Sequence, residues 1–172
     1  REVRDHIEVL DEIETVLNIK CAPVTWPIGM GKAFKGIYDL MTDTIHVFKQ
    51  GQASVVPDDI QIKGLDSPEA LELLGEELVE EVKEEIELVQ AASHEFDLQE
   101  YLDGKLTPVF FGTALANFGV REMLNYFVEW APSPLPRGTD LGEVAPDSDK
   151  FTGFVFKIQA NMDPKHRDRI AF

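Results

Sequence analysis

The chain has 172 residues, of which 44% are hydrophobic and 28% are charged, a composition typical of a folded globular protein rather than a disordered one. Its net charge of −16 excludes binding to nucleic acid through the overall electrostatic field, because phosphates are neutralised by lysine and arginine. Any contact with RNA would therefore need a local basic patch. No apolar run approaches the ~20 residues of a membrane span, so we expect neither DNA nor a membrane as a partner.

Cys21 is the only cysteine in the chain. One thiol forms no internal disulfide and no thiolate metal site, and it is compatible with a reducing compartment, so we expect a cytoplasmic protein. The chain begins at Arg1 without an initiator methionine or a signal peptide. We interpret it as a piece of a longer protein.

The first 65 residues predict one helix followed by several strands. Apolar residues recur at helical spacing over 3–17, which predicts a helix that ends before Cys21. Residues 23–28 predict a short strand bounded by prolines, and 34–40 and 44–48 predict two strands joined by a polar turn. A further strand is possible at 60–62.

A long acidic helix is predicted next. Ser67, Pro68 and Glu69 have the residue types of an N-cap, a first helical position and an acidic first turn. Apolar residues from Leu71 to Val89 then form one stripe. Most other positions carry acids that we expect to be solvated: Glu76, Glu77, Glu80, Glu81, Glu84, Glu85 and Glu87. A second helix is expected over 95–102.

Residues 107–111 are almost all apolar, which predicts a strand buried on both faces. Small residues follow at 112–114, and then a helix whose apolar face carries Val120, Met123, Leu124, Phe127 and Val128. The order of strand, small-residue loop and helix is half of a βα unit from a parallel sheet, so the fold class is α/β. Open α/β sheets bind ligands at the edge where this loop lies.

A proline-rich segment marks a domain boundary. We expect a first domain over 1–131, an extended linker over 132–150, and the start of a second domain over 151–172. In that last stretch, 151–160 predicts a strand and 169–172 the beginning of another.

Two groups of residues resemble functional sites only superficially. Gly29–Lys32 partly matches a phosphate-binding loop, but Ala33 replaces the hydroxyl residue that would bind Mg²⁺, so a turn between strands is preferred and a small kinase is excluded. The four histidines lie far apart in sequence and lack metal-ligand spacing: His6, His46, His94 and His166. We expect these histidines, like Cys21, to have structural roles.

A basic cluster stands out in the otherwise acidic chain. Lys165, His166, Arg167 and Arg169 lie within five positions. One interpretation is a patch that contacts phosphates. The other is a charged hairpin loop with internal ion pairs to Asp163 and Asp168.

Several strings in the chain resemble translational GTPases. Residues 107–115 (Thr-Pro-Val-Phe-Phe-Gly-Thr-Ala-Leu), 117–120 (Asn-Phe-Gly-Val) and 130–134 (Trp-Ala-Pro-Ser-Pro) resemble the fifth guanine-nucleotide motif and the helix that leaves it. Residues 27–29 and 34–40 resemble the G-prime insertion of elongation factor G. Residues 154–169 (Phe-Val-Phe-Lys-Ile-Gln-Ala-Asn-Met-Asp-Pro-Lys-His-Arg-Asp-Arg) resemble the peptide chain release factor 3 family.

The resemblance covers essentially the whole chain and implies a specific function. The chain would hold the C-terminal remnant of a P-loop GTPase domain, an α+β insertion at about 30–104, and the first strands of a β-barrel domain. The family is a ribosome-dependent GTPase, a class II release factor that promotes departure of stop-codon-reading release factors during translation termination. It binds GTP or GDP with Mg²⁺.

The same resemblance assigns residues to partners. Thr113, Ala114 and Leu115 would face the guanine, with the Ala114 amide near the base carbonyl. The other four nucleotide motifs are absent, so we expect this chain alone neither to bind nor to hydrolyse GTP. The insertion would face the ribosomal stalk protein, and Lys165, His166, Arg167 and Arg169 would contact small-subunit ribosomal RNA.

Two alternatives remain at this stage. One is a fragment of elongation factor G or of a ribosomal protection protein. The string over 161–169 argues against this alternative. The other is a non-enzymatic acidic interaction module without a nucleotide.

Overall fold

The structure is a computed structural model that describes residues 4–48, 60–113, 116–140, 142–161, 165 and 168–172. It is a mixed α/β protein with several small sheets. The chain divides into two compact units, Arg1–Ala131 and Pro132–Phe172. None of the helices in the described residues is both long enough and apolar enough to span a bilayer.

The first helix, α1 (His6–Leu17), is confirmed. The Asp5 carboxylate accepts hydrogen bonds from the backbone N–H groups of Ile7 and Glu8, which satisfies two donors at the helix start. The helix ends at Asn18, whose left-handed backbone (φ 53°) stops it.

A two-stranded parallel sheet follows from β1 (Lys20–Pro23) and β6 (Leu106–Val109). The parallel pairing expected for the strand before the small-residue loop is confirmed. Burial on both faces is wrong, because Thr107 is exposed and Val109 is only half-buried. The pair has no further strand to cover it among the described residues.

The single strand expected at 23–28 is wrong, because this stretch belongs to two sheets. The chain changes sheet at Val24, whose N–H donates to the Val109 carbonyl (2.9 Å) and whose carbonyl accepts from the Leu40 N–H (2.9 Å). The second sheet is antiparallel, in the order β2-β3-β4-β5. Its strands are β2 (Thr25–Ile28), β3 (Gly36–Asp39), β4 (Thr44–Val47) and β5 (Gln61–Lys63).

The long acidic helix is in fact two helices, α2 (Pro68–Leu74) and α3 (Glu76–Ala92). Gly75 separates them with a backbone of φ 83° and ψ 154°, which is outside the helical region. The Ser67 cap is confirmed, because its hydroxyl accepts from the Ala70 N–H (3.2 Å). The helix expected over 95–102 is shorter, α4 (Leu98–Leu102), and begins after Asp97.

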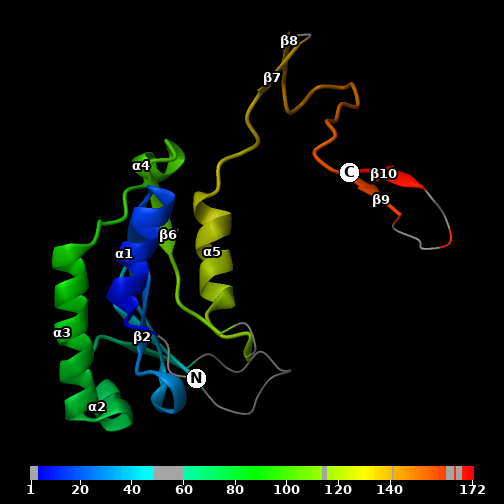
Figure 1. Ribbon diagram of the computed structural model, residues 1–172. Coiled ribbons are helices and arrows are strands. Elements are labelled where there is room, and N and C mark those ends of the chain that lie inside the picture. Colours follow the sequence, from blue (N-terminus) through cyan, green and yellow to red (C-terminus); the bar gives the residue numbers. More distant parts are fainter. Residues whose placement is uncertain (1–3, 49–59, 114–115, 141, 162–164, 166–167) are drawn as a thin grey trace. The chain divides into compact units, whose positions relative to one another are not determined.

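The core of the first unit is centred on Trp26 of β2, which is 1% exposed. Val82, Ile86 and Val89 of α3 pack in the same cluster. The Trp26 indole N–H donates to the Glu85 carboxylate (2.8 Å), so Glu85 is not part of a solvated acidic face as expected. In the view of Figure 1, α1 lies between α3 and α5 (Val120–Trp130).

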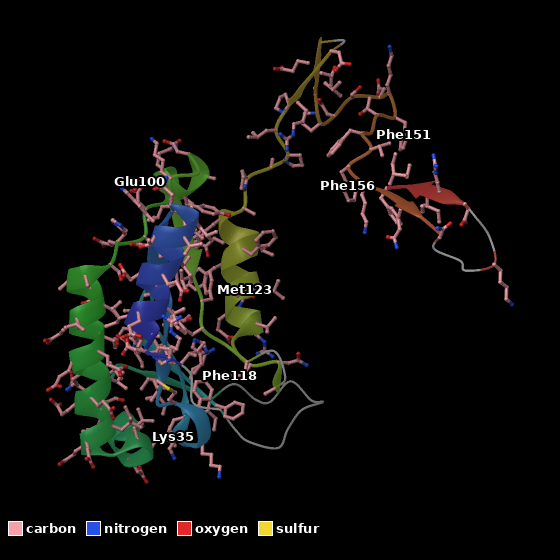
Figure 2. All side chains as sticks on the ribbon, in the orientation of Figure 1. Lys35, Glu100, Phe118, Met123, Phe151 and Phe156 are labelled. Carbon is pink, nitrogen blue, oxygen red and sulfur yellow. The ribbon has the colours of Figure 1, made fainter. Side chains whose placement is uncertain are left out.

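Helix α5 is confirmed, but its apolar face is not buried. Met123, Leu124, Phe127 and Val128 are exposed, Val128 by 80%, and Met123 is labelled on this helix in Figure 2. The buried residues of α5 are instead Glu122 and Trp130. A polar and aromatic stripe therefore holds α5 to the rest of its unit.

The second unit contains two hairpins. The first pairs β7 (Arg137–Thr139) with β8 (Gly142–Val144), within the segment expected to be a linker. The second pairs β9 (Ile158–Ala160) with β10 (Arg169–Ala171). Most of the strand expected over 151–160 is therefore irregular, and Phe151, Phe154 and Phe156 are exposed (Figure 2).

Candidate functional site

The candidate site is the connection between β6 and α5, at the carboxyl end of a parallel strand. Its two stems are joined by backbone hydrogen bonds: the Thr113 N–H donates to the Phe118 carbonyl (2.9 Å), and the Phe118 N–H donates to the Thr113 carbonyl (3.1 Å). The Ala116 N–H also donates to the Thr113 carbonyl (3.2 Å). The two stems are thus paired at Thr113 and Phe118.

Two glycines permit this close approach. A Cβ on Gly112 would lie 2.7 Å from the Phe118 carbonyl oxygen, and one on Gly119 would lie 2.6 Å from the Phe111 carbonyl oxygen. Gly119 also has a positive φ of 78° and begins α5 as its N-cap. Larger residues at either position would force the stems apart.

The first stem is anchored to the four-stranded sheet. The Thr25 hydroxyl, at the start of β2, accepts a hydrogen bond from the Phe111 N–H (2.8 Å). Thr25 is fully buried. The Phe111 ring packs edge-on against Trp26 with 5.2 Å between ring centroids. The end of β6 is therefore fixed to β2 by a hydrogen bond and by an aromatic contact.

The second stem is anchored to the same sheet by three phenylalanines. Phe34 lies between β2 and β3, Phe48 directly follows β4, and Phe118 ends the loop. Their ring centroids are 5.2 Å (Phe48 and Phe118), 5.3 Å (Phe34 and Phe48) and 5.7 Å (Phe34 and Phe118) apart. We call these three residues the phenylalanine triangle.

Helix α5 continues this attachment with polar contacts. Glu122 is 8% exposed, and its Oε1 lies 3.5 Å from Nδ1 of His46 in β4. The Tyr126 hydroxyl donates to both oxygens of the Asp39 carboxylate, at 2.9 and 3.0 Å. Burial and this bond to Asp39 raise the pKa of Tyr126 well above its usual value, so the phenol stays protonated as a donor.

Sequence reasoning missed this attachment, although the sequence contains a pattern for it. Glu122, Tyr126 and Trp130 recur every four residues and therefore lie on one side of α5, and Phe118 precedes them at the same spacing just before the helix. Trp130 completes the stripe by stacking on Phe96 (4.0 Å between centroids). The neighbouring stripe, which the sequence singles out as the apolar face, carries Met123, Leu124, Phe127 and Val128 and is exposed.

The predicted guanine-facing residues are described only in part. Thr113 lies in the first stem, half-buried, while Ala114 and Leu115 fall outside the described residues. Of the basic cluster, Lys165 lies exposed between β9 and β10, and Arg169 begins β10. His166 and Arg167 also fall outside the described residues, as does Asp163, the proposed ion-pair partner.

The connection around Lys32 is not built like a phosphate site. Residues Gly31–Ala33 form a short 3₁₀ turn between two antiparallel strands, not a loop from a strand into a long helix. This confirms the interpretation as a turn. The described residues also contain no cluster of three or more metal-ligating side chains.

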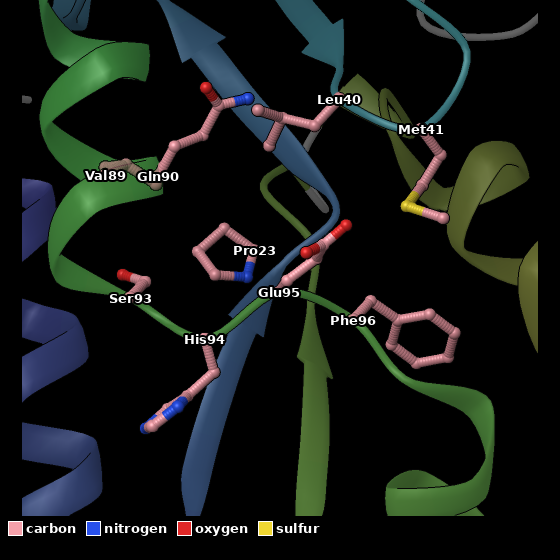
Figure 3. Close-up of a pocket in the computed structure, with 9 residues that line it drawn as sticks. All are labelled: Pro23, Leu40, Met41, Val89, Gln90, Ser93, His94, Glu95 and Phe96. Atoms are coloured by element: carbon pink, nitrogen blue, oxygen red, sulfur yellow. The ribbon is translucent and has the colours of Figure 1, made fainter.

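A separate cavity of about 350 Å³ lies beside the C-terminal end of α3. Pro23 lies at its centre, Gln90 and Glu95 extend over it, and His94 points away (Figure 3). Its described lining has no lysine or arginine. This cavity therefore does not suit a phosphate.

No protein-family model matches the chain. Among solved structures, the chain is similar to a protein from Thermus thermophilus, with 19% sequence identity and a TM-score of 0.42 over 82% of this chain. The match covers 24% of that protein, so the chain spans about a quarter of its length.

Proposed function

We propose that the chain is part of a class II peptide chain release factor. In this account it is the C-terminal part of a P-loop GTPase domain with its insertion, followed by the first strands of a β-barrel domain. The longer protein binds GTP and GDP with Mg²⁺ and hydrolyses GTP on the ribosome. It thereby promotes release and recycling of the stop-codon-reading release factors.

The observation that carries the proposal is the pair of hydrogen-bonded stems that follows β6. It follows a parallel strand, which is where α/β sheets bind ligands, and glycines at 112 and 119 bring its two stems together. The residues of this loop are those that resemble the fifth guanine-nucleotide motif. In the proposed complex Thr113, Ala114 and Leu115 face the guanine, and the Ala114 amide lies near the 6-oxygen of the base.

Two incompletely covered surfaces support the proposal that the chain is part of a larger protein. The parallel pair of β1 and β6 is short of the several strands such sheets normally have, and α5 exposes Met123, Leu124, Phe127 and Val128 beside it. An exposed apolar helix face of this kind marks an interface. We propose that the remaining strands of the GTPase domain cover it.

The partner surfaces follow from the same proposal. The exposed acids of α3, which include Glu80 and Glu84, belong to the insertion that faces the stalk protein. Charge reversal at these two positions tests that contact in the longer protein. Lys165, His166, Arg167 and Arg169 contact small-subunit ribosomal RNA, so Arg167→Glu or Arg169→Glu should weaken ribosome binding and reduce its dependence on salt.

Calorimetric titration of GDP and GTP tests the proposed nucleotide site. The longer protein should bind both nucleotides, and Gly112→Ala should weaken that binding by pushing the stems of the loop apart. Gly138→Ala is the matched control, because Gly138, like Gly112, has no positive φ and a Cβ there meets no atom within 4 Å. The 172-residue chain alone should bind neither nucleotide. Failure of the longer protein to bind guanine nucleotides would overturn the proposal.

The alternative is a non-enzymatic acidic interaction module. The many exposed glutamates of α3 favour it over other classes of protein, because they offer a surface for a basic partner. The same titration separates the two proposals, because a binding module has no affinity for GDP in any length of the protein.

A further inference from the structure

We infer that the cavity beside the C-terminal end of α3 binds a small organic cation, a primary amine with an apolar body. The apolar body lies against the apolar side chains of the cavity, and the ammonium group lies at the Glu95 carboxylate. The inference goes beyond the proposed function and does not depend on it, because the lining of this cavity includes no residue of the connection between β6 and α5.

The lining of the cavity is mostly apolar and firmly held. Val89 of α3 is 2% exposed and belongs to the hydrophobic core. Phe96 stacks on Trp130, with 4.0 Å between ring centroids. The apolar side chains of the lining are Pro23, Leu40, Met41, Val89 and Phe96. Such a surface is available to an apolar ligand without prior rearrangement, as in most small-molecule sites.

The end of α3 places an acidic side chain over this apolar surface. The Ser93 N–H donates to the Val89 carbonyl (2.8 Å), and the extended backbone of Ser93 ends the helix. The chain then continues along the cavity through the segment that carries Glu95. Figure 3 shows Glu95 extended over the cavity, with Pro23 at its centre.

Three polar side chains of the lining have no partner in the protein. Within the residues that the structure describes, the side chains of Gln90, Ser93 and Glu95 make neither a hydrogen bond nor an ion pair. A few polar groups around an apolar surface are the usual means by which a cavity orients a ligand. These three groups are therefore available to a bound molecule.

The charge of the lining selects a cation. No lysine or arginine is present in the described lining, and His94 points away, with its Nε2 3.7 Å from the Glu14 carboxylate. Glu95 is thus the one charged side chain that extends over the cavity in the part of the chain described. An ammonium group has three N–H donors, which suit the Glu95 carboxylate and the Gln90 amide oxygen. The net charge of −16 also raises the local concentration of cations.

The size of the cavity favours a free small molecule over a segment of a partner protein. Its volume of about 350 Å³ lies at the lower end of the range for small-ligand sites, roughly 300–1,000 Å³. A stable protein interface instead covers about 800 Å² on each partner. The ligand is therefore a compact amine with one apolar group.

Three compounds with the same phenyl ring and a chain of similar length test the inference on the 172-residue chain: phenylbutylamine, phenylbutanol and phenylbutyrate. NMR of isotope-labelled methionine methyl groups follows binding, because Met41 lines the cavity and Met123 of α5 does not. Phenylbutylamine should shift the Met41 signal and leave the Met123 signal unchanged. It should bind roughly five-fold more tightly than phenylbutanol, the upper end for an exposed ion pair, and phenylbutyrate should bind more weakly than either.

Two variants of equal charge separate a local effect of Glu95 from the overall field. Glu95→Gln should abolish the difference in affinity between the amine and the alcohol. Glu81→Gln is the matched control, because Glu81 is also exposed but does not line the cavity, and this variant should keep the difference. Both positions are exposed, so both variants should keep the urea midpoint of the unaltered chain.

Three results would overturn the inference. The first is equal binding of phenylbutylamine and phenylbutanol, or no shift of the Met41 signal with either. The second is an equal loss of amine affinity in both variants, which would assign the attraction to the overall charge. The third is tighter binding of a short peptide of leucine and lysine than of phenylbutylamine, which would assign the cavity to a basic protein segment.

Discussion

The hydroxyl of Tyr126 donates hydrogen bonds to both carboxylate oxygens of Asp39, at 2.9 and 3.0 Å, across 87 residues of sequence. Asp39 is only 3% exposed and also accepts from the N–H groups of Met41 and Thr42. This contact joins the helix that follows the candidate loop to the four-stranded sheet. It makes the position of α5 depend on that sheet.

Removing the hydroxyl should destabilise the first unit. Tyr126→Phe leaves the buried Asp39 carboxylate with two backbone donors, so we expect a loss of about 1–3 kcal/mol in the free energy of unfolding. Urea denaturation measures this loss. Tyr101→Phe is the control and should have an effect within about 0.5 kcal/mol, as for most surface changes. Equal effects of the two changes would show that the bond to Asp39 contributes nothing.

Alkaline pH should destabilise the fold through tyrosines. Burial, and bonds to Asp43 and Asp39 respectively, raise the pKa of Tyr38 and of Tyr126 above the usual value of 10.0. Unfolding then releases protons, so the stabilisation is complete below pH 10.0 and is lost as pH rises towards the folded pKa values. From pH 9 to pH 11, the midpoint of urea denaturation should fall more steeply for the unaltered chain than for Tyr126→Phe. Parallel profiles would contradict this assignment.

A pair of glycine substitutions measures the closure of the loop. Gly119 and Gly104 have similar positive φ values, 78° and 72°, but only a Cβ at Gly119 would clash with backbone. Gly104→Ala should therefore cost about 1–2 kcal/mol for the left-handed conformation alone. Gly119→Ala should cost clearly more. Equal losses in thermal or urea unfolding would mean that the stems do not approach as closely as described.

Substitutions on the two faces of α5 should differ in how much they lower the free energy of unfolding of this chain. Trp130 is 8% exposed and stacks on Phe96, so Trp130→Ala should cost about 3–5 kcal/mol. Phe127 is 60% exposed, so Phe127→Ser should cost little in the 172-residue chain. In the longer protein the same change should cost more, because we propose that further strands cover this face. If Phe127→Ser cost the same in the 172-residue chain and in the longer protein, this would argue against further strands that cover this face.

Local patterns of the sequence predicted where helices and strands lie better than they predicted which of them contact one another. The Ser67 cap, the turn between β3 and β4, and the parallel strand before the loop all depend on a few neighbouring residues, and the structure confirms them. The break at Gly75 was missed, because the apolar stripe continues across it. A pattern of apolar residues at helical spacing is not interrupted by one glycine. The pattern therefore gives no sign that the backbone leaves the helical region at Gly75.

The candidate site was predicted only as a loop. Its attachment to the sheet uses residues far apart in sequence, such as Phe34 with Phe118 and Asp39 with Tyr126. No local pattern pairs such residues. The apolar face of α5 also gives no guide to the attachment, because its side chains lie exposed and the helix is held by the neighbouring polar and aromatic stripe.

The central claim is that this chain belongs to a GTPase that acts on stop-codon-reading release factors. The most direct measurement is the dissociation rate of a fluorescently labelled release factor from terminated ribosomes, with the longer protein and GTP added. We expect faster dissociation, which Gly112→Ala should reduce and Gly138→Ala should leave unchanged. Unchanged dissociation, or GTP-driven translocation in its place, would contradict the account.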